Sequence, residues 1–340
     1  MIEAESQDLT LQSEYKDLLR AFLENKSEQD LYDAQQYSKR LLENQISPEE
    51  MVSLHCAVLE EIFEGLPIEI TESFSFLLEV MIGYGLAYRE HQSLRDKQLE
   101  LEMQIDVAAN MQQTLLPKKI PQIPGVDIGV ISVPAGKMSG DYYYCVKNES
   151  GHFGVAIADI IGKGIPAAMC MSMIKYAIDS MPSYSLEPGV LLKNLNRVVE
   201  QNIDPSMFIT MMYGSYDAVN HTFVYSGAGH EPGFYFNASE GKFRDLYAKG
   251  LVLGVSNKTN FREQKIKVSV GDAIVLLSDG VTECRIGDRF IEREEINDLL
   301  INYIDLPAQE MVERVYDELA QLQDFKLNDD FTLMVLRRQV

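Results

Sequence analysis

The first third of the chain carries apolar side chains every three or four positions, which is the spacing of one face of an α-helix. Residues 11–23 and 30–45 show this pattern clearly. A surface helix buries such a face against its neighbours and leaves the opposite face in water. The pattern therefore predicts an all-helical N-terminal region.

The helix boundaries in this region are marked by capping and breaking residues. Ser47 with Pro48 and Glu50 predicts a helix start, with a serine cap, a proline in the first turn and a glutamate that completes the capping box. The glycine and proline within 65–67 break the following helix. Because 70–115 contains no proline, we expect one long helix there.

The second half of this long helix has the seven-residue spacing of a coiled coil. The seam positions alternate between apolar and polar layers, which predicts a marginal coiled coil whose polar layers fix register or hold a helix pair between two states. A solvated connector helix is the alternative. The seam consists of Leu94, Leu101, Ala108 and Leu115 at d, and Gln98, Ile105 and Gln112 at a.

Beyond Pro117, Pro121 and Pro124 the pattern changes to short apolar runs separated by glycine turns. Strand runs mixed with helix pairs indicate a layered sandwich in a mixed α/β (α+β) fold. The expected strands are 127–133, 141–147, 153–158, 208–216, 222–227, 233–236, 266–270, 273–278 and 331–337, and the expected helices are 165–180, 187–202 and 292–322.

Composition narrows the class of protein. A chain of 340 residues with 46% apolar side chains is expected to form two folding units with real cores. The net charge of −22 repels nucleic acid and anionic membranes. The N-terminus is acidic and no uninterrupted apolar stretch reaches the length of a membrane span, so a cytosolic location is expected. The four cysteines are scattered singly, which favours core positions over a disulfide framework or a zinc site.

Four aspartates stand where apolar runs end, at Asp141, Asp159, Asp279 and either Asp329 or Asp330. A carboxylate at the end of a buried strand is unfavourable unless it reaches water or a cation. Four such positions in one domain favour a shared shell of ligands for metal ions.

The ligand types indicate the metal and the reaction. Oxygen ligands without histidine or cysteine select magnesium or manganese. Two such ions can share a water molecule, lower its pKa and clamp a transferring phosphoryl group, which predicts hydrolysis of phosphate esters without a covalent intermediate. The glycines of 162–164 do not form a nucleotide-binding P-loop, because the first glycine and the Ser or Thr of that motif are missing.

Five motifs in a fixed order resemble one known family. SGDYYY, ADIIGKGIPAA, SGAGHEPG, LLSDGVTE and NDDFTL, spread over 120–340, are similar to the SpoIIE-type branch of the PPM metal-dependent serine/threonine protein phosphatases. The resemblance implies an αββα sandwich that holds two Mn²⁺ or Mg²⁺ ions between its sheets.

Carried over motif by motif, the resemblance assigns a role to each acid. Asp141 corresponds to the carboxylate that bridges both ions, and Asp159 to a ligand of one ion with the carbonyl of Ile160 beside it. Asp279 and Asp329 correspond to ligands of the other ion. Asp330 is then the hydrogen-bonding neighbour of Asp329, or the ligand in its place.

The roles of Lys137 and His230 each have two possible interpretations. Eukaryotic members of the family place an arginine before the first aspartate to hold phosphate, and here PAGKMSGD offers only Lys137. This lysine is either a phosphate contact or an ordinary solvated lysine. His230 either contacts the substrate or the site, or is a turn histidine bonded to the backbone.

The resemblance also implies an organisation and partners. Residues 1–90 would form a helical regulatory domain for dimerisation and partner binding, 91–118 a helical linker and 119–340 the phosphatase domain. The substrate would be a phosphorylated STAS-domain anti-anti-sigma protein (RsbV-like), and the activator a kinase-related protein (RsbT-like) that binds the N-terminal helices. The enzyme would be a homodimer that promotes the general stress response.

Two other classes of protein remain as alternatives from the residues alone. A nucleotidyl cyclase also binds two metal ions through aspartates at strand ends. A scaffold with a degenerate site would keep the helical region and lose metal ligands, whereas all four acids are present here.

Overall fold

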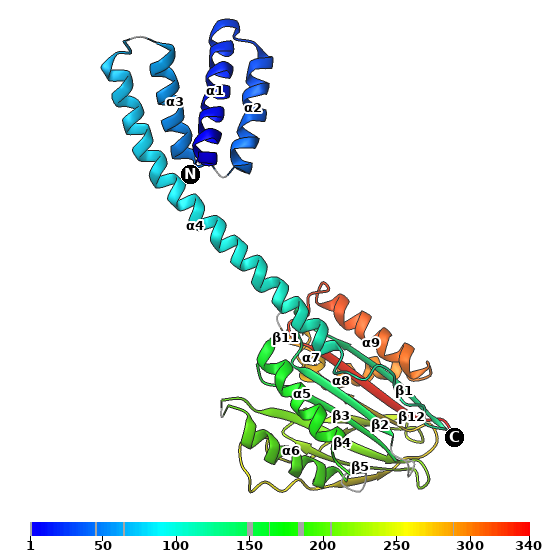
Figure 1. Cartoon of the computed structure of the whole chain (residues 1–340). Helices are drawn as coiled ribbons and strands as arrows, with labels where there is room; N and C mark the ends of the chain where they lie inside the picture. Colours follow the sequence, from blue (N-terminus) through cyan, green and yellow to red (C-terminus); the bar gives the residue numbers. More distant parts are fainter. Residues whose placement is uncertain are drawn as a thin grey trace. The chain divides into compact units, whose positions relative to one another are not determined.

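The computed structural model describes residues 2–44, 46–63, 65–147, 152–162, 164–182, 187–204, 206–287 and 289–340, without the side chains of 2–10, 42 and 43. The chain divides into two compact units, Met1–Leu101 and Glu102–Val340 (Figure 1). Each unit is described by itself. The narrower domain limits at residues 90 and 118 stay a prediction.

The N-terminal unit is helical, as the apolar spacing predicts. Ser47 caps its third helix, because its side chain accepts a hydrogen bond from the Glu50 backbone N–H and the Glu50 carboxylate accepts one from the Ser47 N–H. The predicted break after this helix and the long helix beyond it are both confirmed. The helices are α1 (Ile2–Asn25), α2 (Glu28–Glu43), α3 (Pro48–Ile62) and α4 (Ile68–Gln113).

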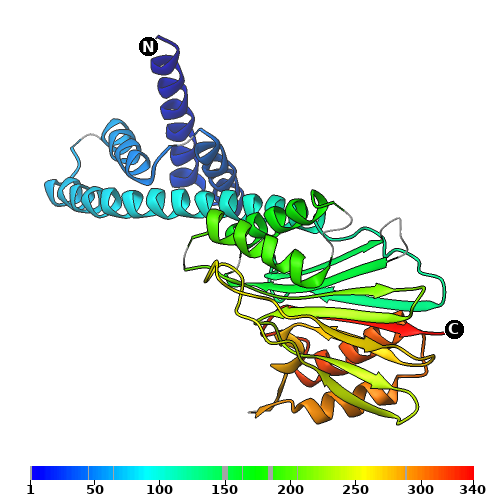
Figure 2. The ribbon, with the colours of Figure 1, turned by 90° about the horizontal axis from the view of Figure 1, so that it is seen from below.

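The C-terminal unit contains two antiparallel five-stranded sheets, seen between their helices in Figure 2. The first sheet has the order β1-β12-β9-β6-β7 and the second β2-β3-β4-β5-β8. The strands are β1 (Val126–Val133), β2 (Asp141–Lys147), β3 (His152–Ile160), β4 (Ile209–Asp217), β5 (Thr222–Ala228), β6 (Gly233–Asn237), β7 (Lys242–Leu246), β8 (Gln264–Lys267), β9 (Ala273–Leu277) and β12 (Phe331–Arg338), with β10 (Arg285–Ile286) and β11 (Arg289–Phe290) in a separate hairpin.

Helices cover the outer faces of both sheets. One apolar cluster joins α5 and α6 to the second sheet, another joins α8 and α9 to the first sheet, and a third lies between the sheets around Phe153, Ile157, Leu276 and Met334. The layer order is therefore helix, sheet, sheet, helix, and the αββα prediction is confirmed. The helices are α5 (Ile165–Asp179), α6 (Pro188–Asn202), α7 (Asp279–Thr282), α8 (Arg293–Asn302) and α9 (Ala308–Leu322).

The differences from the expected elements have local causes. The region 292–322 forms two helices because Pro307 has an extended backbone (φ −51°, ψ 142°) and starts α9. Strand β7 was not predicted, because it is an edge strand in which only Leu246 is buried and the apolar pattern is weak. The strand expected at 266–270 lies at Gln264–Lys267, and the short β10–β11 hairpin was not expected.

Candidate metal centre

Asp141 and Asp159 are direct cross-strand partners at one end of the second sheet. Asp141 is only 2% exposed, and its Oδ2 has no hydrogen-bond partner in the described part of the chain. Burial raises the pKa of Asp141 well above its ordinary value, and the charges of Asp159 and Asp330 raise it further. Hydrogen bonds from Ser278 and Thr332, which belong to the first sheet and the end of its strand β9, oppose this rise. The Asp141 carboxylate thus lies between the two sheets, where a cation would compensate its charge.

Gly140 packs closely beside this pair, where a larger side chain would be crowded. A Cβ atom at Gly140 would lie 3.0 Å from the Ile160 carbonyl oxygen and 3.1 Å from Asp159 Oδ1. The Ile160 N–H donates to the Gly140 carbonyl over 3.1 Å, which holds the two segments together. The carboxylate of Asp159 and the carbonyl of Ile160 therefore border one space that a side chain at position 140 would fill.

Asp279 and Asp329 form a second acidic pair. Asp279 is the first residue of α7, directly after β9, and burial raises its pKa, followed by the charges of Asp329 and Glu283. A side chain at Gly280 would overlap the backbone carbonyl of Asp330, so glycine is needed for α7 to pass this close to the start of β12. The close approach brings residues 50 positions apart in the chain to the same place.

Asp330 has a different role from Asp329 in this geometry. Its buried carboxylate accepts hydrogen bonds from the N–H groups of Ala135 (2.7 Å) and Gly140 (2.6 Å), one on each oxygen. Its own N–H donates to Asp329 Oδ1 over 3.0 Å. Because both oxygens of Asp330 are committed to the loop before Asp141, the geometry supports Asp329 as the metal ligand and Asp330 as its hydrogen-bonding neighbour.

These donors fit hard divalent cations. Within the described ranges no three acidic, histidine or cysteine side chains are grouped to hold one ion, so the acids act as two pairs. Magnesium is typically held by one or two carboxylates and completes its shell with water. The unpartnered oxygen of Asp141, the space beside Gly140 and the oxygen-only donor set all agree with such ions. The residues that would hold them are Asp141, Asp159, Ile160 through its carbonyl, Asp279 and Asp329.

Lys137 lies against the linker segment of α4 in this structure. Its Nζ is 2.6 Å from Asp106 Oδ1, both side chains are about half exposed, and the hydrogen bond to Asp106 raises the pKa of Lys137. This placement favours the solvated-lysine interpretation over a phosphate contact.

Gln112 joins the end of α4 to the loop before Asp141. Its amide donates to the Ser139 carbonyl (2.6 Å) and accepts from the Ser139 N–H (2.9 Å), and the residue is only 5% exposed. The Ser139 hydroxyl in turn accepts from the Asp141 N–H over 3.1 Å. Leu115, three residues on, packs on the core of the second sheet. Gln112 and Leu115, the last two positions of the predicted coiled-coil seam, therefore make contacts within the C-terminal unit.

His230 is a buried structural residue in this structure. Its Nε2 donates to the Leu277 carbonyl (3.2 Å), so its Nδ1 accepts from the Thr210 hydroxyl (2.8 Å). These bonds tie β9 of one sheet to β4 of the other, and burial lowers the pKa of His230 to about 4. The geometry favours the backbone-bonded interpretation of this histidine.

The turn after Asp159 relies on glycine. Gly162 and Gly164 have φ values of +108° and +81°, which lie in the left-handed region. Lys163, between them, lies outside the described residues. Pro166 then occupies the first turn of α5, so the glycines act as turn residues at a helix start.

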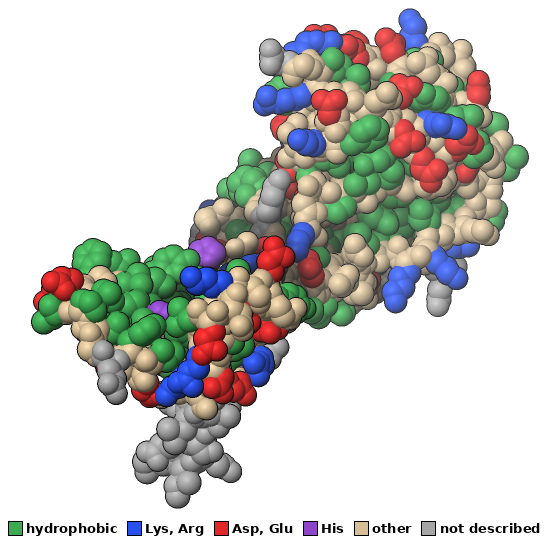
Figure 3. Space-filling model, turned by 90° about the horizontal axis from the view of Figure 1, so that it is seen from above, with side chains coloured by type: hydrophobic (Ala, Val, Ile, Leu, Met, Phe, Trp, Pro, Cys, Tyr) green, Lys and Arg blue, Asp and Glu red, His purple; other side chains and the backbone are tan. Residues whose placement is uncertain are grey.

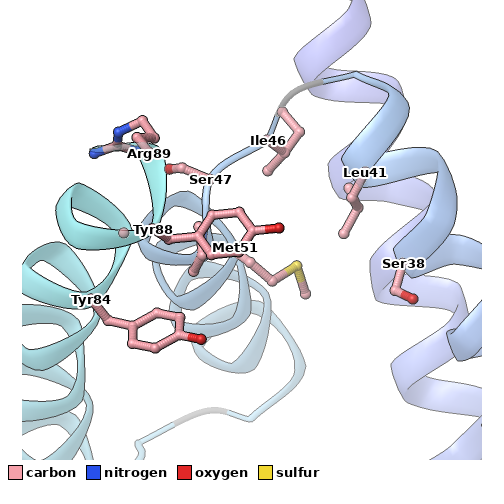
Figure 4. Close-up of a pocket in the computed structure, with 10 residues that line it drawn as sticks. Ser38, Leu41, Ile46, Ser47, Met51, Tyr84, Tyr88 and Arg89 are labelled. Carbon is pink, nitrogen blue, oxygen red and sulfur yellow. The ribbon is translucent and has the colours of Figure 1, made fainter. Parts of the chain in front are cut away.

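The helical unit has an apolar pocket of about 640 Å³. Tyr84 and Tyr88 of α4 and Met51 of α3 point into it, and Leu41 and Ile46 lie across from them (Figure 4). Apolar side chains also lie exposed on this unit in Figure 3. On α4 they include Phe76, Val80, Tyr84, Leu86 and Tyr88, each 46–74% exposed.

The helix α4 is also apolar enough to qualify as a membrane span by length and composition. Its best 18-residue window has a mean hydropathy of 1.2, with 6% of the window buried. Glu72 and Glu79 lie in the apolar half of this helix, so the window is not an uninterrupted apolar stretch. A protein partner on the exposed face of α4 would account for the same composition.

Comparison with known proteins identifies relatives of both units. The family model for stage II sporulation protein E (SpoIIE) matches residues 149–339, and the model for the N-terminal domain of phosphoserine phosphatase RsbU matches 13–87. The chain is 53% identical to phosphoserine phosphatase RsbU of Bacillus subtilis over 330 residues, which are 97% of this chain and 98% of that protein.

Solved structures share the fold of the C-terminal unit. The SiaA-PP2C domain of Pseudomonas aeruginosa matches with a TM-score of 0.63 at 18% identity, over 71% of this chain and 98% of that one. The RsbU and RsbW domains of a Mycobacterium tuberculosis protein match with a TM-score of 0.56 at 27% identity, over 65% of this chain and 63% of that one.

Removing the buried charge of Asp141 should weaken metal binding and at the same time raise the stability of the metal-free protein. We expect Asp141→Asn to abolish tight Mn²⁺ binding in calorimetric titration. The metal-free variant should be more stable by about 1–3 kcal/mol in urea unfolding, since the substitution removes an uncompensated buried charge. The exposed Asp305→Asn is the control and should change neither quantity. Unchanged Mn²⁺ affinity in Asp141→Asn would refute the ligand role.

The buried neutral state of His230 should make stability depend on pH. The folded pKa of about 4 lies below the ordinary value of 6.5, so the unfolded chain binds the extra proton first as pH falls. The contribution is fully present above pH 6.5 and should decline by up to about 3 kcal/mol toward pH 4. Urea unfolding from pH 4 to 7 should show this slope in the native protein and a smaller slope in His230→Gln. Equal slopes would contradict the assignment.

Proposed function

The chain belongs to the RsbU-type phosphoserine phosphatases of the SpoIIE-type PPM family, and from that premise we propose that it dephosphorylates a STAS-domain anti-anti-sigma protein (RsbV-like) under the control of an RsbT-like activator. The reaction class is hydrolysis of a phosphoserine monoester by a serine/threonine protein phosphatase. The observation that carries the proposal is the buried Asp141 carboxylate opposite Asp159; one Asp141 oxygen has no hydrogen-bond partner among the described residues.

The residues of the chain prepare the site for two Mn²⁺ or Mg²⁺ ions. Such ions, when bound, would lower the pKa of a shared water and neutralise charge on the transferring phosphoryl group. Asp141, Asp159 and the Ile160 carbonyl would hold one ion, and Asp279 and Asp329 would hold the other. Asp330 holds the loop before Asp141 through two backbone N–H groups, so the first carboxylate is fixed before any ion arrives.

The substrate assignment rests on similarity along the whole chain. The relative that carries the name phosphoserine phosphatase RsbU aligns with both the helical unit and the catalytic unit at 53% identity. This supports a shared partner set, because both the regulatory and the catalytic parts are retained. The proposal extends to a cytoplasmic location and a positive role in the general stress response.

The N-terminal unit offers surfaces for the proposed activator and for homodimerisation. Its pocket of about 640 Å³ is lined by Tyr84, Tyr88 and Met51, and exposed apolar side chains continue along α4. Apolar surface of this kind favours association with protein. We assign the activator and the second subunit to residues 1–90, and the transmission of their effect to the linker at 91–118.

The contact between Gln112 and Ser139 supports this route of transmission. Ser139 lies two residues before Asp141; its carbonyl accepts a hydrogen bond from the Gln112 amide and its N–H donates one to the Gln112 side-chain oxygen. A shift of the linker that moved Gln112 would therefore act on the loop that positions the first metal ligand.

The direct test is release of phosphate from a phosphorylated STAS protein with Mn²⁺, with and without the activator. We expect slow release that the activator accelerates. Deletion of residues 1–90 should abolish the acceleration and preserve basal hydrolysis of small phosphate esters. A truncated protein that still responds fully to the activator would refute the N-terminal assignment, and formation of a cyclic nucleotide from a nucleoside triphosphate would identify a cyclase instead.

The Gln112 contact yields a second prediction, with a neighbouring glutamine as matched control. Gln112→Ala should lower kcat on the STAS substrate by about 10-fold or more, because Asp141 loses its positioning loop. Gln113→Ala, an exposed residue one position on, should stay within about twofold of the native protein. Equal activity of the two variants would remove Gln112 from the route.

A further inference from the structure

A small pocket beside the candidate metal centre contains an arginine, Arg285, that forms no ion pair with the described residues. It measures about 180 Å³. Its walls come from the start of α7, the β10–β11 hairpin and the loop before β12. The lining residues are Gly280, Glu283, Arg285, Phe290, Gln323, Asn328 and Asp329. The pocket therefore opens directly against Asp329, one of the proposed ligands, and against the residue that follows Asp279.

Arg285 is the cation among these lining residues. Its guanidinium stacks over the Phe290 ring, with Cζ 4.9 Å from the ring centroid. Arg285 and Phe290 are paired across the hairpin, and the hairpin is closed by a hydrogen bond from the Ile291 N–H to the Cys284 carbonyl (2.8 Å), both residues being buried. The stacking restricts the orientation of the guanidinium plane.

The neighbouring arginines are already committed to carboxylates. Arg289 binds both oxygens of Glu295 at 2.7 and 2.8 Å. Arg293 pairs with Glu231 and with Asp245. Arg293 also stacks on an aromatic ring, that of Phe234 at 4.2 Å. Arg285 differs from Arg289 and Arg293 in forming no ion pair with the described residues.

A cation at this place would add a contact to the phosphate beside the proposed metal ions. The ions would balance the charge of the four carboxylates, whereas a guanidinium would also orient the phosphate oxygens. The lysine expected from the sequence to meet phosphate, Lys137, is paired with Asp106 instead. A planar guanidinium forms two parallel hydrogen bonds to phosphate oxygens, which makes it a strong and oriented phosphate ligand.

The size and walls of the pocket match a phosphorylated side chain. A volume of 180 Å³ is below the roughly 300–1,000 Å³ of sites for drug-sized ligands, so it suits a phosphoserine side chain better than a nucleotide. Asn328 donates to the Gln323 side-chain oxygen over 3.1 Å, which presents a neutral amide wall opposite the arginine. Glu283, also in the lining, would repel phosphate, so the phosphate oxygens would have to lie on the Arg285 side of the pocket.

We propose that Arg285 is the substrate-binding residue that contacts the phosphate of the phosphoserine monoester, in a pocket bounded by Phe290, Asn328 and Asp329. This inference rests on the proposed phosphatase function and adds the residue that recognises the phosphate dianion. The same contact would hold inorganic phosphate, the product.

The test uses the full-length protein with saturating Mn²⁺, a phosphorylated STAS protein as substrate and inorganic phosphate as inhibitor. Arg285→Gln should lower kcat/KM by about 10- to 100-fold and raise the inhibition constant of phosphate by a similar factor, because one charge-assisted pair of hydrogen bonds is lost. Arg285→Lys should recover part of both effects. Arg289→Gln, on the facing strand of the same hairpin, is the matched control and should stay within about twofold.

Three results would overturn the proposal. One is an unchanged inhibition constant for phosphate in Arg285→Gln. Another is an equal loss in Arg289→Gln, which would assign the effect to the hairpin fold. The third is a loss of Mn²⁺ affinity in Arg285→Gln that accounts for the lost activity, which would assign Arg285 to the support of the metal ligands. Failure of the proposed function itself is distinguishable, because then the native protein would release no phosphate.

Discussion

The structure of the C-terminal unit depends on a carboxylate that is placed where water cannot reach it. Asp141 is almost wholly buried, stands opposite Asp159, and has an oxygen without a partner in the described chain. A buried charge without compensation is unfavourable by several kcal/mol, so this arrangement is disfavoured in the absence of a cation. The hydrogen bonds of Asp330 to the loop before Asp141, and the glycine at position 140, hold the Asp141 carboxylate in this buried position. They do not compensate its charge.

The two acidic pairs come from different sheets, so only the closed sandwich assembles the site. Asp141 and Asp159 belong to neighbouring strands of the second sheet, whereas Asp279 and Asp329 flank the ends of β9 and β12 in the first. His230 bonds across the same end of the sandwich, from β4 to β9. Packing of the sheets against each other therefore determines the separation of the pairs. Stability and function share the same interface, which is typical of sites that carry locally unfavourable charges.

The sequence predicts much of this architecture because its signals are local. Ser47, together with Pro48 and Glu50, predicts a helix start from adjacent residues alone. An aspartate at the end of an apolar run indicates that the strand ends outside the apolar core. The individual metal ligands were predicted from motif similarity, because a strand-end aspartate alone does not indicate which ion it would bind. The choice between Asp329 and Asp330 needed geometry, since only the bonds to Ala135 and Gly140 distinguish two adjacent acids.

The features that the sequence did not predict depend on contacts between distant segments of the chain or belong to strands that bury few side chains. Strand β7 and the β10–β11 hairpin bury too little to produce an apolar pattern, although the hairpin carries Arg285. Pro307 could have predicted the break between α8 and α9, because proline disfavours the interior of a helix. The break was missed because the helical spacing of apolar residues is present on both sides of Pro307. The pairing of Lys137 with Asp106 could not be read from either residue alone.

Ser139 engages one N–H and the carbonyl oxygen of the Gln112 amide, and the Gln112 residue is only 5% exposed. The heptad assigns the same side chain to the inner face of a helix pair. Because Gln112 is already buried, a second helix that packed on this layer would have to displace the loop that carries Ser139. Helix pairing that extended this far and the present position of the loop would therefore exclude each other.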